Sequence, residues 1–143
     1  MKTKFAIGIV IVSIFILGGL FLSRGQKENI VKTQPAQSSS FQNVTSPDLA
    51  TMLENKDFFF VNVHIPYEGE IAKTDAFIPY NEIGNNLDKL PQDKNAKIVL
   101  YCRSGRMSVE AAQTLTKLGY TNVYNHTGGM IDWEARGYSV IDK

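Results

Sequence analysis

The sequence KIVLYCRSGRMSVEAAQTLTKLGY, residues 97–120, decides the fold of this chain. Residues 97–101 form a mostly apolar run of strand-favouring side chains, which predicts a central β-strand. Residues 108–118 carry apolar side chains at helical spacing, and Gly119 follows them as a stop signal, so they predict a helix. Residues 102–107 are then the loop that joins the predicted strand to the predicted helix.

The same alternation of strands and helices extends outward from this stretch. Further strands are predicted at residues 41–44, 58–63 and 122–124, and further helices at residues 46–56, at 81–90 and from Gly128 onward. Residues 64–80 contain Pro66 and Pro79 and are predicted to be a long connection. Strands that alternate with helices indicate the α/β class, with a parallel central sheet flanked by helices on both faces.

Composition excludes several classes of protein. The chain has 143 residues, of which 43% are hydrophobic and 20% are charged, so one domain with a buried core is expected. The formal net charge of +1 offers no basic excess for phosphates, and we expect no nucleic-acid partner. A single cysteine excludes an internal disulfide framework and a metal site built only from cysteines.

The N-terminal part of the chain differs from the rest. Residues 5–22 carry no charge, and as a helix they would span about 27 Å, close to the hydrocarbon thickness of a bilayer. We therefore expect residues 1–25 to be a signal anchor, or transmembrane segment, that binds the membrane. A cleaved signal with its site after Gly18 or Gly19 is the main alternative, and a helix buried in the domain is a further one.

Residues 26–40 are polar and include Pro35 and three consecutive serines, which predicts a flexible linker, with an ordered arm as the alternative. The domain itself is then expected at residues 41–143. Because a short N-terminal tail with two lysines normally stays in the cytoplasm, we expect a single-pass protein of the cell membrane with its domain on the extracytoplasmic side. Signal cleavage would instead give a periplasmic or secreted domain.

Cys102 is the candidate catalytic residue, because it lies where a parallel strand ends and a helix begins. The helix N-terminus would direct unpaired N–H groups at the loop, and Gly105 would let the backbone curl. Arg103 and Arg106 would add positive potential, and all of these features favour a thiolate. A buried structural cysteine is the alternative.

Residues 97–138 closely resemble the second half of a single-domain rhodanese-like protein, the sulfurtransferase family. The resemblance is carried by the strand into Cys102, by the loop residues Arg103, Ser104 and Gly105, and by further matching positions. These are Ala111, Ala112, Leu118, Gly119, Tyr120, Val123, Gly128, Gly129, Met130, Trp133 and Gly137. The resemblance extends less strongly over residues 41–143 and implies a parallel sheet of about five strands. It also implies that Cys102 accepts a sulfane sulfur as a persulfide and that residues 103–107 bind the substrate.

The chain departs from the family pattern at two places, and residues 62–71, 74–75 and 77–80 resemble a divergent bacterial subgroup of the family. The family loop often carries an arginine as its sixth residue, whereas this chain has Met107 there and Arg106 as the fifth. The family sequence D-x-R after the second strand is Asn62-Val63-His64 in this chain. We expect Arg106 to replace the missing arginine in attracting an anionic donor.

Two further residues are candidates for lining the pocket. His64 follows a predicted buried strand, where a histidine with satisfied hydrogen bonds is the simplest interpretation, and a general base or ligand the alternative. Glu70 lies in the connection with Glu68 and Asp75. These carboxylates line the mouth of the pocket or bind a cation, or they belong to a solvated loop face, which is the simplest interpretation. His126, near Gly128, is expected to be structural.

The function that these residues favour is a rhodanese-type sulfurtransferase. Cys102 would take sulfur from thiosulfate or a persulfide and pass it to cyanide or a thiol, and a thioredoxin-like protein would be a partner that supplies such a thiol. We expect no metal and no organic cofactor. The alternative is a binding or sensing module that presents a persulfide or an anion to a partner protein without turnover.

A cysteine phosphatase or arsenate reductase is disfavoured by spacing. Those enzymes use a C-x5-R loop whose arginine binds the oxyanion of the substrate. Counted from Cys102, that arginine would fall at position 108, which is Ser108.

Overall fold

The computed structural model describes residues 40–143 of the chain. The predicted anchor at residues 1–25 lies outside the described residues, and so does the predicted linker at 26–40 apart from Ser40. Among the helices of residues 40–143, none is both long and apolar enough to cross a bilayer.

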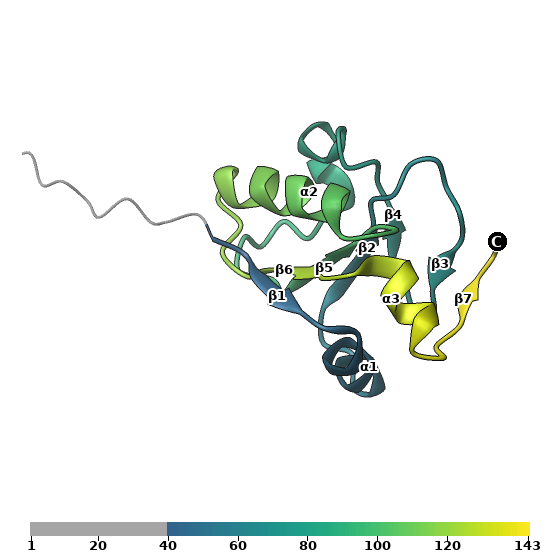
Figure 1. The fold of residues 1–143 in the computed structure, drawn as a ribbon. Helices are drawn as coiled ribbons and strands as arrows, with labels where there is room; N and C mark the ends of the chain where they lie inside the picture. The colour runs from purple at the N-terminus through teal and green to yellow at the C-terminus, as the bar shows by residue number, and fades with distance from the viewer. Residues whose placement is uncertain (1–39) are drawn as a thin grey trace, which may run out of the picture. The chain divides into compact units, whose positions relative to one another are not determined.

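Five parallel strands form the central sheet, in the order β1-β6-β5-β2-β4 (Figure 1). They are β1 (Gln42–Val44), β2 (Phe59–Asn62), β4 (Ala76–Phe77), β5 (Ile98–Tyr101) and β6 (Val123–His126). β5 lies in the middle, between β6 and β2, and all four of its residues are buried. The α/β class and the five-stranded parallel sheet are therefore confirmed.

Helices cover both faces of this sheet, as predicted. α2 (Arg106–Lys117) lies on one face, and α1 (Ser46–Glu54) and α3 (Gly129–Ala135) lie on the other (Figure 1). The α2 face buries Ala111, Ala112 and Leu115 against the sheet. This stripe is the one that helical periodicity predicts, because residues spaced by three and four share one side of a helix.

The predicted helix at residues 81–90 is wrong. The structure has two short 3-10 turns instead, η1 (Ile83–Asn85) and η2 (Leu87–Lys89). Asn86 lies between them in a non-helical conformation, and its side-chain amide donates to the carbonyl of Glu82 at 2.9 Å. An α-helix would give that carbonyl to the backbone N–H of Asn86. Asparagine thus competes with the helical bond, and Gly84 adds a low helix propensity.

The connection at residues 64–80 contains two short strands that the sequence did not reveal. β4 completes the central sheet by pairing with β2, and β3 (Glu70–Ile71) forms a separate antiparallel pair with β7 (Val140–Ile141). Each of these three strands has only two residues, so no alternation of side chains can be recognised in it. These short strands form because their backbones pair with segments that are distant in the sequence.

The start of α2 also differs from the prediction. The helix begins at Arg106, two residues before the expected Ser108, so Arg106 and Met107 belong to its first turn. The loop after β5 is therefore limited to residues 102–105. Gly105 is the N-cap and has a φ of 94°, a left-handed conformation that glycine adopts without strain.

Candidate functional site

Cys102 lies immediately after β5, at the carboxyl end of the sheet, and is 1% exposed. Two groups of the following turn donate to its Sγ: the backbone N–H of Gly105 at 3.1 Å and the hydroxyl of Ser108 at 3.6 Å. Both donors stabilise negative charge on sulfur, because a thiolate is a better acceptor than a thiol. Of the predicted cradle of backbone N–H groups, the structure shows one contact with Sγ, from the N–H of Gly105.

Ser108 is the site residue that sequence reasoning missed. It is fully buried in the first turn of α2. Its single hydroxyl proton can be donated either to Cys102 Sγ or to the carbonyl oxygen of Gly105, which lies closer, at 3.0 Å. The sequence offered one sign of this role: Ser108 is a small polar residue on the side of the predicted helix that faces the core. In the sequence, Ser108 was considered only because it stands where a phosphatase would have an arginine.

A second turn supports the loop that carries Cys102. Gly128 has a φ of 81° and is the N-cap of α3, which follows β6, the neighbour of β5 in the sheet. The first N–H groups of α3 reach across to the loop. Met130 donates to the carbonyl of Cys102 at 3.0 Å, and Ile131 donates to the carbonyl of Arg103 at 3.0 Å.

Gly129 lies where these two turns touch. A Cβ atom at this position would come within 2.3 Å of the Cys102 carbonyl oxygen and 2.6 Å of the carbonyl carbon and oxygen of Arg103. No side chain fits at such distances. The second turn therefore approaches the backbone of the first as closely as glycine allows, and it fixes the direction of both carbonyl groups.

The two arginines of the site are each held by a carboxylate. Arg103 Nε lies 3.0 Å from Glu68 Oε2, and an Arg106 guanidinium nitrogen lies 3.0 Å from Glu110 Oε1. All four side chains are more than two-fifths exposed. The positive potential that the sequence predicts around Cys102 is consequently reduced by two neighbouring negative charges.

His64 is 6% exposed, and it differs from the predicted histidine with satisfied hydrogen bonds. Within the described residues, neither of its ring nitrogens has a hydrogen-bond partner. Its Nε2 lies 3.3 Å from Glu68 Oε2, outside hydrogen-bond geometry. Val63 packs with Cys102 in the core on the α2 face, so strand alternation turns His64 to the other face of the sheet.

Glu70 is the remaining residue predicted to line the pocket. It is half-buried in β3, where its backbone pairs with Ile141 of β7. The described contacts do not bring its carboxylate to the loop that carries Cys102. Ser104 and Met107 lie in that region as expected, with Ser104 exposed in the loop and Met107 half-buried against the α2 core.

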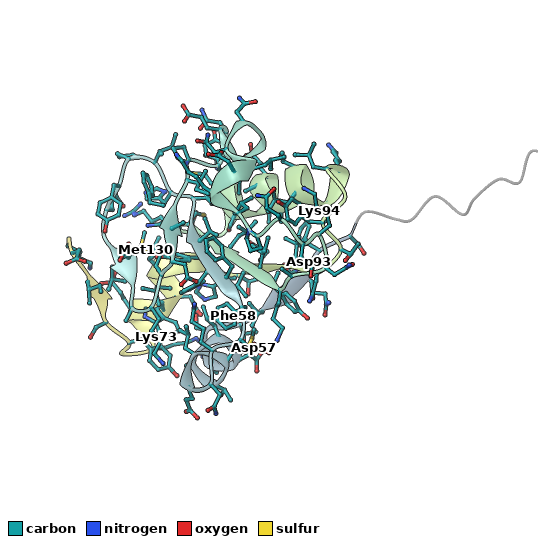
Figure 2. The ribbon with its side chains drawn as sticks, turned by 180° about the vertical axis from the view of Figure 1, so that it is seen from behind. Asp57, Phe58, Lys73, Asp93, Lys94 and Met130 are labelled. Atoms are coloured by element: carbon teal, nitrogen blue, oxygen red, sulfur yellow. The ribbon has the colours of Figure 1, made fainter. Side chains whose placement is uncertain are left out.

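A cleft of about 420 Å³ borders the loop on the α3 side. Met130, Ile131 and Val140 give it an apolar wall, and its charged walls are two ion pairs. One pair is Arg103 with Glu68, and the other is Lys143 with Glu134. Cys102 itself does not line the cleft, which borders the loop at the neighbouring residue Arg103. Figure 2 labels Met130 at this part of the domain.

A serine, a histidine and an aspartate come together beneath α3 without forming a nucleophilic triad. The Ser46 hydroxyl lies 2.8 Å from His126 Nε2 and donates to Asp132 Oδ2 at 2.5 Å. The aspartate thus binds the serine instead of the histidine, and Ser46 is fully buried. Burial lowers the pKa of His126 to about 4, against a smaller opposing effect of the Asp132 charge. The expected structural role of His126 fits this network.

Within residues 40–143, no three His, Cys, Asp or Glu side chains gather in a group that could hold a metal ion.

Comparison with known proteins places the chain in a family. Residues 49–136 match the rhodanese-like domain family. The chain is 33% identical over 75 residues to thiosulfate sulfurtransferase PspE of Escherichia coli, a match that covers 51% of this chain and 71% of that protein.

Two other similarities extend this finding. The chain is 32% identical over 109 residues to the probable adenylyltransferase/sulfurtransferase MoeZ of Mycobacterium tuberculosis, covering 73% of this chain but only 27% of that longer protein. A crystal structure of a rhodanese-related protein from Thermoplasma volcanium aligns with a TM-score of 0.61 at 27% identity, over 71% of this chain and 98% of the other.

Proposed function

Because this chain belongs to the rhodanese-like domain family, we propose that it is a rhodanese-type sulfurtransferase whose Cys102 carries the transferred sulfur. The observation that carries the proposal is the environment of Cys102 Sγ. The Gly105 N–H and the Ser108 hydroxyl both point at this sulfur from the N-terminal end of α2. A nucleophilic thiolate needs such donors, because they stabilise its charge where water is excluded.

The first half of the reaction loads the enzyme. The Cys102 thiolate attacks the outer, sulfane sulfur of thiosulfate or of an organic persulfide. A bond forms between Sγ and that sulfur, and the sulfur–sulfur bond of the donor breaks. Sulfite, or the thiolate of the organic donor, leaves with the electron pair, and the protein keeps a persulfide on Cys102.

The second half returns the enzyme to its starting state. An acceptor such as cyanide or a thiolate attacks the outer sulfur of the persulfide. The sulfur leaves as thiocyanate or as a new persulfide, and the electron pair of the broken bond regenerates the Cys102 thiolate. The Gly105 and Ser108 donors serve the leaving thiolate in this half and the attacking thiolate in the first. The steps balance without a metal or an organic cofactor.

The name of the relative PspE, a thiosulfate sulfurtransferase, supports thiosulfate as one donor. A thioredoxin-like protein is a suitable acceptor in chemical terms, because it supplies a reactive thiolate. Residues 5–22 support a membrane location, because they are an uncharged run of bilayer length. Lys2 and Lys4, which precede this run, support a domain on the extracytoplasmic side. Salt-resistant recovery of the full chain with membranes tests this location, and a soluble product cut after Gly18 or Gly19 would contradict it.

A binding module without turnover is the second candidate. It is favoured by the 1% exposure of Cys102 and by the ion pairs that engage both arginines. Such a module would hold a persulfide but release no product to a small acceptor.

Intact-mass analysis separates these functions. The full chain is incubated with thiosulfate or an organic persulfide and then with cyanide, and Cys102→Ser serves as the control. A sulfurtransferase gains the mass of one sulfur atom, loses it to cyanide and forms thiocyanate over many cycles. One gain without repeated release supports the binding module, and no gain from either donor contradicts both.

A further inference from the structure

The two arginines beside Cys102 are bound by carboxylates of very different origin. Glu110 lies one turn from Arg106 in α2, so their contact is an exposed pair within one helix. Such pairs stabilise little and are easily exchanged for water. Glu68 instead comes from the connection between β2 and β3, and it reaches Arg103 across the carboxyl edge of the sheet.

Glu68 is held in place by its surroundings. The buried Asn62 side chain donates to the carbonyl of Gly69 at 3.0 Å and accepts from the N–H of His64 at 3.0 Å. These bonds tie both ends of the segment that carries Glu68. Its carboxylate then lies between the guanidinium of Arg103 and the buried imidazole of His64. The backbone of this segment is thus held beside Arg103, while the Glu68 side chain itself is 43% exposed.

The cleft beside the loop offers no unpaired cation. Its four charged lining residues are Glu68, Arg103, Glu134 and Lys143, and they form two ion pairs. The rest of its wall includes the apolar side chains of Met130, Ile131 and Val140. A small dianion finds little attraction in such a cleft, whereas an organic donor can place its stem against the apolar wall.

We infer that Glu68 determines donor specificity by holding Arg103, so that the site favours organic persulfides of low charge over the dianion thiosulfate. Glu68 touches Arg103 and not the reacting sulfur, and it is therefore a positioning residue. This inference rests on the proposed sulfurtransferase function, and it identifies the class of donor for that same site.

The test compares two donors in variants of the full chain. The donors are thiosulfate and the persulfide of 2-mercaptoethanol, whose only charge is on its persulfide group. In Glu68→Gln, kcat/KM for thiosulfate should rise about 2- to 10-fold, mainly through KM, because an exposed arginine is released to a dianion. The kcat/KM for the organic persulfide should change by less than about twofold, because a donor with a smaller negative charge is attracted less strongly by the released arginine.

Asp57→Asn is the matched control. It also removes one negative charge and one ion pair, in this case with Lys97 at 2.7 Å. Asp57 precedes the amino-terminal end of β2, whereas Cys102 follows the carboxyl end of the neighbouring parallel strand β5. Figure 2 labels Asp57. Both donors should react with this variant as with the original chain.

A double variant separates the release of Arg103 from a general change in charge. In an Arg103→Gln background, Glu68→Gln should no longer raise thiosulfate use, because no guanidinium is left to release. An equal rise for both donors, the same rise in Asp57→Asn, or a rise that persists in the double variant would overturn the inference while sulfur transfer itself stands. Failure of every protein, original chain included, to take sulfur from either donor would overturn the proposed function and this inference with it.

Discussion

Two neighbouring turns of this molecule have the same construction and different tasks. β5 and β6 lie side by side, and each ends in a turn whose last residue is a glycine of positive φ, Gly105 or Gly128, at the start of a helix. The first turn carries a thiol under two hydrogen-bond donors. The second places glycine where a side chain would clash and donates its N–H groups to the first. In the proposed function the first turn carries the reacting thiol, and its neighbour holds the backbone of that turn in place.

The largest expected effect comes from replacing the thiol in the first turn. Cys102→Ser should lower sulfur transfer by at least about 100-fold, because a serine hydroxyl is not ionised at neutral pH. The replacement is nearly isosteric, so urea unfolding should change little. Thiocyanate formation from thiosulfate and cyanide measures the effect. Substantial transfer by this variant would show that the chemistry does not belong to this turn.

The second prediction tests the supporting turn. Gly129→Ala introduces a Cβ that would meet the Cys102 carbonyl oxygen at 2.3 Å, and the φ of Gly129 is 58°. We expect a loss of about 2–4 kcal/mol in the free energy of unfolding, from backbone displacement and strain together. Sulfur loading should fall as well, because the loop of Cys102 moves with the displaced backbone.

Gly119→Ala is the matched control for that change. Gly119 also has a positive φ, of 91°, but its added Cβ would meet nothing within 4 Å. Only backbone strain of about 1–2 kcal/mol should appear, with normal sulfur loading. Equal losses of stability and loading in the two variants would show that the second turn gives the first no special support.

The third prediction concerns the network beneath α3. The pKa of His126 is lowered by burial from its ordinary value of 6.5 to about 4. Between these pH values the unfolded chain binds a proton that the folded chain does not, so the free energy of unfolding falls as pH falls through this window. The full difference is roughly 3 kcal/mol.

Urea unfolding at pH 7 and at pH 4.5 measures this loss. His126→Gln should remove that part of the pH dependence, while the glutamine amide can still bond to Ser46. If the variant and the original chain lose the same stability on acidification, His126 is not the group responsible.

The smallest expected effect belongs to the second donor of the first turn. Ser108→Ala should slow persulfide formation about 3- to 10-fold, because the sulfur loses one hydroxyl donor and retains the Gly105 N–H. Thr114→Val is the control, since it removes an α2 hydroxyl that bonds only to Glu110. A normal loading rate in Ser108→Ala would leave the backbone N–H as the donor that matters.

The sequence alone determined the position of the thiol. The periodicity of residues 97–118 placed Cys102 between a central strand and a helix. Because parallel strands alternate with helices in this class of fold, that junction lies at the carboxyl edge of the sheet, where ligands bind. These inferences are reliable because they depend on neighbours in the chain. The four longer strands and the helices on both faces followed for the same reason.

Only the tertiary structure decided what surrounds the thiol. The contact of Gly129 with the Cys102 carbonyl and the ion pair of Glu68 with Arg103 join segments that are distant in sequence. The sheet order β6-β5-β2 brings these segments to one edge, and no local pattern encodes that order. Strand β4 is likewise too short to show a period and exists by pairing with β2. Local periodicity thus predicts where the nucleophile lies, whereas the charge and rigidity of its surroundings arise from long-range contacts.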